Sequence, residues 1–141
     1  MSIRTAKARW EGNLAEGKGN VAFGNGAFDG AYSFQSRFEE GTGTNPEELI
    51  AAAHSACFSM AFSAGLAKNG FTPTSVETTA KVSLEKVGEG FTITGITLDT
   101  VAHVPGIERA KFDEIAAGAK TGCPISRALS AVPITLNAEL K

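Results

Sequence analysis

The stretch that most constrains the fold is TNPEELIAAAHSACFSMAFSAGLAKNG, which covers residues 44–70. It opens with helix-start signals, because Asn45 can cap a helix and Pro46 suits the first helical position. Gly70 is a typical C-terminal stop. We therefore expect one helix from about Pro46 to Asn69, about 36 Å long at roughly 1.5 Å per residue.

The expected helix has almost no polar face. Glu47 and Glu48 favour the positive end of the helix dipole, and Glu48 can also reach back to the cap. Alanine dominates the rest, and the bulky apolar residues spread around the helix: Leu49, Ile50, Phe58, Met60, Phe62 and Leu66. A helix that is apolar all round is buried in a large core or an interface. A protomer of 141 residues is small for that task, so we expect a second protomer to cover the helix.

Length and charge limit the class of protein. The 141 residues predict one domain, residues 1–141, with 43% hydrophobic and 20% charged residues. The net charge of −2 argues against nucleic acid or an anionic membrane as the main partner, because both attract basic patches. Segment 49–67 is a weak membrane span because His54 and three serines interrupt it. The start, MSIRTAKARWEG, has no apolar signal segment, which predicts a cytoplasmic protein.

The rest of the chain predicts an α+β fold with an antiparallel or mixed sheet. Before the helix, glycine turns separate three stretches that we interpret as strands in a meander or pair of hairpins: AKARWEG, GNVAFG and GAYSFQSRF. After the helix we expect strands at 75–87, 91–104 and 133–140, a hairpin turn at 88–90, a helix at 107–122 and a short helix opened by Pro124. Strands and helices do not alternate as βαβ units.

The chain has two cysteines, Cys57 in the long helix and Cys123 in TGCPIS. A lone cysteine on an apolar helix is commonly a small core residue. Cys123 is different, because it lies between a glycine and a proline at a helix start, where free N–H groups stabilise a thiolate. Mid-helix amides are already bonded, so a reactive Cys57 needs a cation from elsewhere in the fold.

Two other interpretations stay open at this point. His54 and Cys57 are spaced i, i+3, and Cys123 with His103 could complete a four-ligand zinc site, although no CxxC or HxxxH motif is present. The chain could also be a small-molecule or lipid-binding dimer whose cysteines sense redox state or fill the core.

Several segments together resemble the OsmC/Ohr family of bacterial hydroperoxide reductases, most closely its osmotically inducible OsmC branch. The matching segments are SRFEEG (36–41), GTNPEELIAAAHSACFSMA (43–61), FTPTSVETTAKVSLEKV (71–87), VPGI (104–107) and GCPISRAL (122–129). They are spread over nearly the whole chain, and the long helix combined with the Gly-Cys-Pro element is a specific signal.

The resemblance implies an intertwined homodimer, with sheets around two long central helices, and a peroxidase that uses no metal or cofactor. Cys57 would be the peroxidatic and Cys123 the resolving cysteine, with Arg37 supporting the Cys57 thiolate and Glu47 orienting that arginine. By themselves Arg37 and Glu47 resemble a surface strand arginine and a first-turn glutamate. Glu48 is the obvious alternative to Glu47, and only the family position separates them.

The resemblance also implies the reaction partners. The substrate would be an organic hydroperoxide, and the reductant an external dithiol, with lipoylated proteins as the family's suggestion. Four phenylalanines are candidates for the apolar surroundings of the site, two on the long helix and two on the expected strand before it: Phe58, Phe62, Phe34 and Phe38.

Helix geometry raises a question about how the site is assembled. Glu47 and Cys57 are ten residues apart, which on a straight helix is about 15 Å along the axis and roughly 80° around it. An arginine held by Glu47 is then badly placed for Cys57 of the same helix. Either the helix begins later than Pro46, or Arg37 and Glu47 of one chain serve Cys57 of the other.

Overall fold

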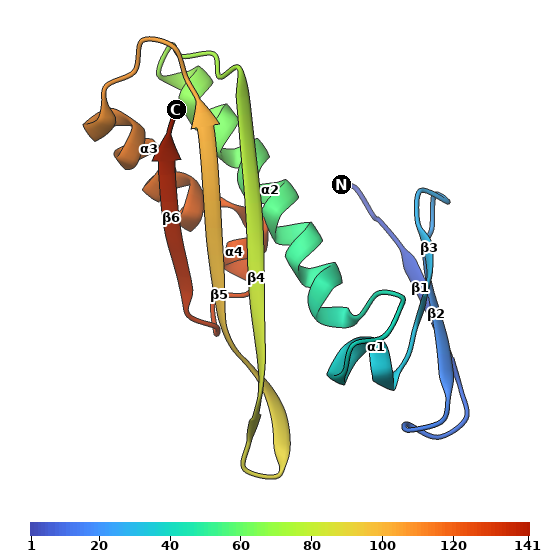
Figure 1. The fold of residues 1–141 in the computed structure, drawn as a ribbon. Helices are drawn as coiled ribbons and strands as arrows, with labels where there is room; N and C mark the ends of the chain where they lie inside the picture. Colours follow the sequence, from blue (N-terminus) through green and yellow to red (C-terminus); the bar gives the residue numbers. More distant parts are fainter. The chain divides into compact units, whose positions relative to one another are not determined.

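A computed structural model describes all residues from Met1 to Lys141. The chain forms two compact units, Met1–Leu49 and Ile50–Lys141. Figure 1 shows the order of the elements, three strands and a short helix, then a long helix, two long strands, two helices and a final strand. The sequence therefore predicted the α+β class correctly.

The first unit is built on a three-stranded antiparallel sheet. Its strands are β1 (Ala6–Glu11), β2 (Lys18–Phe23) and β3 (Asp29–Tyr32), in the order β1-β2-β3. The expected meander is present in these residues. On one face the rings of Trp10 and Tyr32 lie 5.4 Å apart, an aromatic pair that links the two outer strands across β2.

The second half of GAYSFQSRF is a helix rather than a strand, so this part of the sequence interpretation was wrong. Helix α1 spans Phe34–Phe38. Ser33 caps it: the Ser33 hydroxyl accepts the Ser36 N–H at 3.1 Å, and the Ser36 hydroxyl accepts the Ser33 N–H at 2.8 Å. This reciprocal capping box outweighs the strand preference of the neighbouring aromatic residues.

The long helix α2 spans Pro46–Lys68, one residue shorter than expected. Its cap is the predicted one, because the Asn45 side-chain oxygen accepts the Glu48 N–H at 2.8 Å. The Glu48 carboxylate does not reach back to that cap and instead accepts the Thr44 hydroxyl at 2.9 Å. At the other end Gly70 has a φ of +84°, the left-handed conformation that a helix stop favours.

The second unit contains a mixed sheet of three strands: β4 (Ser75–Val87), β5 (Gly90–His103) and β6 (Ile134–Leu140). β4 and β5 form the expected hairpin, and β6 pairs in parallel with β5. Between β5 and β6 come helices α3 (Arg109–Gly122) and α4 (Pro124–Ala128), close to their expected bounds.

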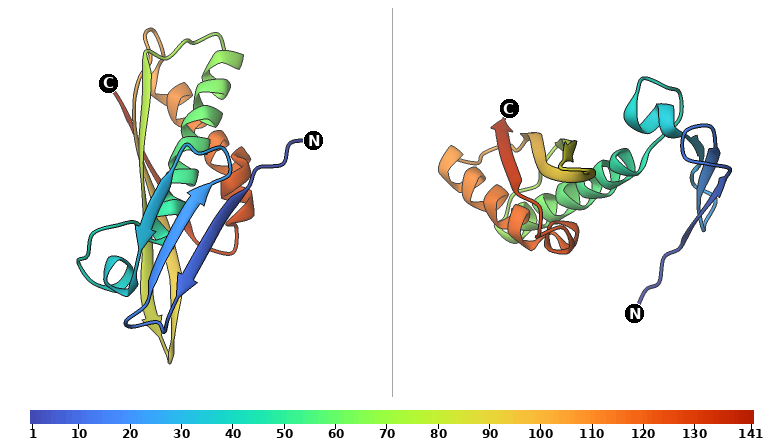
Figure 2. Two further views of the ribbon diagram at one scale, coloured as in Figure 1. Left: turned by 90° about the vertical axis from the view of Figure 1, so that its right-hand side faces the viewer. Right: turned by 90° about the horizontal axis from the view of Figure 1, so that it is seen from below.

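The core of the second unit lies between this sheet and its helices, which cover one face of the sheet (Figure 2). Phe62 is fully buried at its centre, with its ring 5.8 Å from Phe58 on the same helix and 5.3 Å from Phe112 of α3. Ile96 and Leu98 of β5 belong to the same buried cluster and contribute to it from the sheet. Burial of such large rings supplies much of the hydrophobic stabilisation of this unit.

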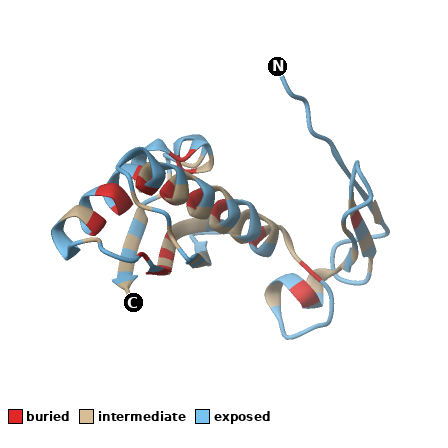
Figure 3. Ribbon diagram, turned by 90° about the horizontal axis from the view of Figure 1, so that it is seen from above, coloured by how far each residue is buried: buried red, intermediate tan, exposed pale blue.

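Helix α2 is not buried on all sides within one chain. Its buried face repeats every four residues, with His54, Phe58, Phe62 and Leu66 all fully buried. Figure 3 shows buried and exposed residues alternating along its ribbon. Between the exposed charged residues at its ends, Glu48 and Lys68, the exposed side is also apolar and consists of Ala52, Ala53, Ala56, Met60, Ala64 and Ala67, with Met60 75% exposed. By length and composition α2 could cross a membrane, but its buried face belongs to this core.

Two glycine substitutions should change stability in opposite directions. At both Gly70 and Gly118 an added side-chain carbon would lie in open space, but only Gly70 has a positive φ. We expect Gly70→Ala to cost about 1 kcal/mol through backbone strain. Gly118→Ala, inside α3, should gain about 0.5–1 kcal/mol through helix propensity. Urea unfolding at equal protein concentration measures both, and equal signs would contradict the assigned helix stop.

Candidate active site

The two cysteines lie side by side in the second unit. The Cys57 and Cys123 sulfurs are 3.0 Å apart, and both thiols are reduced. Cys57 comes from the middle of α2, where it is half-buried, and Cys123 is fully buried at the junction of α3 and α4. A contact this short lets the pair share a proton or form a disulfide with little movement of the backbone.

A second contact between the same two helices lies beside the thiols. The Nε2 atom of His54 is 2.7 Å from the hydroxyl oxygen of Ser126, and both residues are buried. His54 precedes Cys57 by three residues and Ser126 follows Cys123 by three, so one helical turn separates the two contacts on each helix. Ser126 was missed in the sequence, where a serine in a short helix carries no signal of its own.

The surroundings move the pKa values of the two thiols in opposite directions. Burial raises the pKa of Cys57, and the hydrogen bond with Cys123 raises it further. Burial would also raise the pKa of Cys123, but hydrogen bonding with Cys57 and with the backbone and hydroxyl of Ser126 brings it below its ordinary value. Within the single chain, Cys123 is therefore the better thiolate.

The expected helix-start position of Cys123 is confirmed, because Cys123 is the N-cap residue of α4 and Pro124 follows in the first turn. Its sulfur does not accept a capping hydrogen bond from a backbone N–H group of α4. The Ile125 and Ser126 amides nevertheless lower its pKa, as expected for N–H groups that no carbonyl occupies.

Arg37 and Glu47 form an ion pair inside the first unit. The Arg37 guanidinium donates from Nη2 to the Glu47 carboxylate at 2.7 Å and from Nε at 3.2 Å. The Glu47 side chain is 9% exposed and that of Arg37 35% exposed, which limits the freedom of the pair. Glu48 makes no such contact, because it is bonded to Thr44. The geometry thus separates the two glutamates that the sequence could not.

Helix α1 and the following loop hold Arg37 in place. The Ser36 hydroxyl donates to the Thr44 carbonyl at 2.7 Å, and the Asn45 side-chain amide donates to the Ser36 carbonyl at 2.9 Å. These bonds fix α1 against the first turn of α2, where Glu47 lies. A multidentate pair between groups positioned in this way is stronger and more directional than an exposed ion pair.

An apolar pocket of about 400 Å³ adjoins Arg37 in the first unit. Its lining is mostly aromatic and aliphatic, with the arginine as its charged member: Trp10, Leu14, Tyr32, Phe34, Phe38 and Pro46 are among the residues. The Arg37 guanidinium also lies 5.1 Å from the centre of the Phe38 ring. A cationic group beside an apolar cavity suits a ligand with a polar head and a hydrocarbon body.

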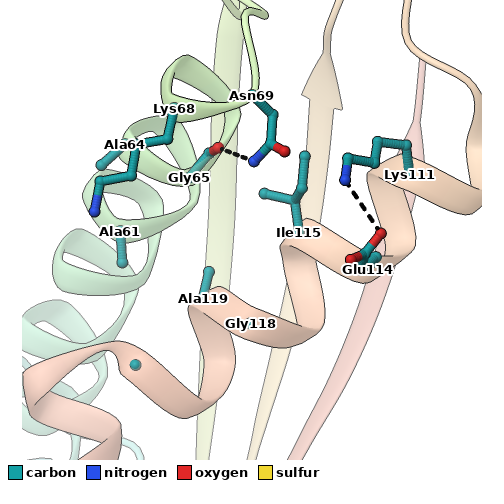
Figure 4. Close-up of a pocket in the computed structure, with 11 residues that line it drawn as sticks. Ala61, Ala64, Gly65, Lys68, Asn69, Lys111, Glu114, Ile115, Gly118 and Ala119 are labelled. Carbon is teal, nitrogen blue, oxygen red and sulfur yellow. Dashed lines mark hydrogen bonds and ion pairs between the residues drawn. The ribbon is translucent and has the colours of Figure 1, made fainter.

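A groove of about 430 Å³ runs between α2 and α3 in the second unit (Figure 4). Most of its lining residues are small, and Gly65 is needed there because a side-chain carbon would lie 2.9 Å from Ile115. Lys68 and the Lys111–Glu114 ion pair lie at its polar edge. These small residues let the two helices approach closely. The groove contains neither of the two cysteines.

The four residues of the zinc alternative do not gather. No three histidine, cysteine, aspartate or glutamate side chains lie close enough to hold a metal ion. His103 is exposed at the end of β5, and His54 is engaged with Ser126. The fold therefore does not support the structural metal site that the spacing of His54 and Cys57 suggested.

Comparison with known proteins assigns the family. The family model described as OsmC-like protein matches residues 39–137. The chain is 52% identical to peroxiredoxin OsmC of Escherichia coli K12, over 98% of this chain and 96% of the relative. It is 35% identical to the organic hydroperoxide resistance protein OhrB of Bacillus subtilis, over 91% of each. The chain belongs to the OsmC-like family.

A solved structure gives the same result at the level of the fold. An organic hydroperoxide resistance protein OsmC from Legionella pneumophila superposes with a TM-score of 0.73 at 26% identity, over 99% of each chain. The resemblance found in the sequence is thus confirmed by a family model, by curated relatives and by the fold.

Proposed function

We propose that this protein is a thiol peroxidase that reduces organic hydroperoxides to alcohols through Cys57 and Cys123. The observation that carries the proposal is the 3.0 Å contact between the two reduced thiols, one half-buried and one fully buried. Membership of a family whose relatives are named peroxiredoxin and hydroperoxide resistance protein supports the same chemistry. The alternative, a ligand-binding dimer with redox-sensing cysteines, needs no turnover.

The cycle has three steps. The Cys57 thiolate attacks the distal peroxide oxygen, the O–O bond breaks, the alcohol leaves with a proton, and Cys57 becomes a sulfenic acid. Cys123 then condenses with this sulfenic acid to form a disulfide and water. An external dithiol reduces the disulfide through a mixed disulfide. We propose lipoylated proteins as that dithiol and the reducing cytoplasm as the compartment.

In the proposed site Arg37 supplies the positive charge that the Cys57 thiolate requires. Because burial raises the pKa of Cys57, its thiolate requires a cation that no residue of the pair supplies. Arg37 keeps its charge at any working pH and can stabilise both the thiolate and the developing alkoxide. Glu47 orients the guanidinium through their ion pair.

The two cysteines should fail differently when replaced. Cys57→Ser should abolish reduction of cumene hydroperoxide with dihydrolipoamide, because no sulfenic acid forms. Cys123→Ser should consume about one equivalent of peroxide per site and then stall or over-oxidise, because the sulfenic acid lacks its partner. Single-turnover stoichiometry with a sulfenic-acid trap measures both. The opposite behaviour of the two variants would reverse the roles, and no turnover of the unmodified protein would favour the binding alternative.

The pocket beside Arg37 supports an organic rather than an inorganic peroxide. Its lining residues present an apolar wall next to the cation, and burial of each methylene of a substrate tail adds about 0.8 kcal/mol. Hydrogen peroxide has no tail to bury. In the proposed site the peroxide group lies at Arg37 and the hydrocarbon lies in this pocket.

We expect a higher kcat/KM for cumene hydroperoxide than for hydrogen peroxide. Leu14→Ser should lower the ratio of these two values at least about fourfold, the equivalent of one lost buried methylene. Ile3→Ser is the matched control, because Ile3 is similarly exposed but lines a different cavity. Steady-state kinetics of both variants measure the ratio, and equal loss in both would remove the pocket from the substrate site.

A homodimer is the assembly that we propose. The exposed side of α2 is an apolar strip of alanines around Met60, and such a strip on a long helix is a surface that another chain covers. The adjoining groove is also lined by small residues, which permit close approach of a second helix. A second copy of this chain carries the complementary surface by symmetry.

Each active site of this dimer is completed in trans. Helix α2 begins at Pro46, so a later start does not bring Glu47 nearer to Cys57. On an ideal helix the ten residues between them correspond to about 15 Å along the axis. Two antiparallel copies of α2 would instead bring the first turns of one helix toward the middle of the other. We therefore assign Arg37 and Glu47 of one chain to Cys57 of its partner.

Subunit mixing tests this arrangement. Cys57→Ser and Arg37→Ala homodimers should each be inactive. A purified heterodimer of the two has one site that lacks both groups and one intact site, so about half of the wild-type activity should return. If subunit exchange is verified and no activity returns, each site is built from a single chain.

A further inference from the structure

His54 is the buried titratable group that the proposed cycle does not use. It is fully buried on α2, and its Nε2 atom is 2.7 Å from the Ser126 hydroxyl. Its Nδ1 atom makes no hydrogen bond to the chain. A polar side chain is costly to bury, and His54 occupies a position in the four-residue repeat that Phe58, Phe62 and Leu66 fill with apolar side chains.

The place of His54 connects it to the resolving thiol. Ser126 is 5% exposed and lies one turn after Cys123, so the His54–Ser126 and Cys57–Cys123 contacts form two neighbouring bridges between α2 and the α3–α4 junction. Through its hydroxyl Ser126 lowers the pKa of Cys123. His54 therefore contacts the residue whose hydroxyl lowers the pKa of Cys123.

The hydrogen-bonding capacities of His54, Ser126 and Cys123 determine which group donates and which accepts in this series of bonds. A serine hydroxyl has one proton, and if it donates that proton to the Cys123 thiolate, its oxygen must accept from another donor. The Nε2–H group of a neutral His54 is that donor. The neutral form then leaves Nδ1 as a bare acceptor, which matches its lack of a partner, since a buried N–H without an acceptor costs more than an unused lone pair.

We propose that His54 is a positioning residue that acts through Ser126 to hold Cys123 as a thiolate for disulfide formation. This inference rests on the proposed function, in which Cys123 resolves the sulfenic acid. Burial lowers the pKa of His54, which favours the neutral form that this role requires. The titratable groups that face Cys123 are Cys57 and, through Ser126, His54.

The step that this thiolate accelerates is the condensation of Cys123 with the Cys57 sulfenic acid. The Cys123 thiolate supplies two electrons to the Cys57 sulfur, the S–S bond forms, and the S–O bond breaks. The hydroxide leaves as water with one proton, the equivalent of the proton that the Cys123 thiol lost on becoming a thiolate. Cys123 is oxidised and the sulfenic sulfur is reduced, so the step needs no other reactant.

The first test measures the Cys123 thiol without any peroxide. In a Cys57→Ser background, thiolate absorbance against pH reports Cys123 alone. We expect both Ser126→Ala and His54→Leu to raise the pKa of Cys123 by about one pH unit, since a hydrogen bond to a charged group is lost or weakened. His54→Gln, which keeps a donor, should restore most of the effect. The Cys123 pKa of the double variant should be close to that of either single variant, because both substitutions break the same series of hydrogen bonds.

The second test follows disulfide formation in a single turnover of the protein with both cysteines. A tenfold smaller thiolate fraction is partly offset by greater nucleophilicity, so we expect disulfide formation about threefold slower in His54→Leu and Ser126→Ala. The preceding sulfenic-acid step should keep its rate. Ser59→Ala is the matched control, because it removes a hydroxyl from α2 that bonds to Thr78 rather than to the thiol region.

The outcomes separate the inference from the proposed function. An unchanged Cys123 pKa in folded His54→Leu overturns the role of His54, even if Ser126→Ala shifts it. His54→Phe replaces this variant, with the same expectation, if His54→Leu does not fold. An equal shift in Ser59→Ala would also overturn the inference. If the pKa shifts as expected but the protein consumes no peroxide, the role of the His54–Ser126 contact stands and the peroxidase assignment fails.

Discussion

The contact between Cys57 and Cys123 is the interaction on which the site depends. It joins the middle of α2 to the junction of α3 and α4, two positions far apart in the chain, at 3.0 Å. The aromatic packing of Phe58, Phe62 and Phe112 holds α2 and α3 together on the same face of the sheet. A close-packed core resists displacement, so the sulfurs stay within reach of one another and a disulfide can form and break without unfolding the helices.

The same packing creates a chemical problem for Cys57, which the proposed role of Arg37 would solve. Partial burial of Cys57 raises its pKa, which disfavours the thiolate that reacts with peroxide. The Arg37–Glu47 pair and the aromatic pocket are built into the first unit, on α1 and the first turn of α2. In the proposed dimer the cation and the pocket come from one chain and the nucleophile from the other, so a monomer would lack a complete site.

The sequence predicted the elements of the second unit well because each has a strong local signal. Glycine at 70, proline at 124 and the period of two in 75–87 gave the helix stop, the α4 start and β4. Helix α1 was missed because its capping box uses two serines, a weaker pattern than serine with glutamate. That one chain would leave part of α2 uncovered was expected from its apolar composition, but which residues form the exposed side was not predicted, because the bulky residues spread around the helix. Glu47 and Glu48 were separable only in space, because Thr44 satisfies one and Arg37 the other.

Unequal exposure and unequal acidity of the two sulfurs also favour one direction for the reductive half of the proposed cycle. Cys123 is fully buried, whereas Cys57 is half-buried, so an external dithiol meets the Cys57 sulfur of the disulfide first. Attack there expels Cys123, the thiol whose pKa lies below its ordinary value, and the more acidic thiol is the better leaving group. The hydrogen bonds that prepare Cys123 to attack the sulfenic acid therefore also help it to leave. One buried arrangement around Cys123 serves both halves of the cycle.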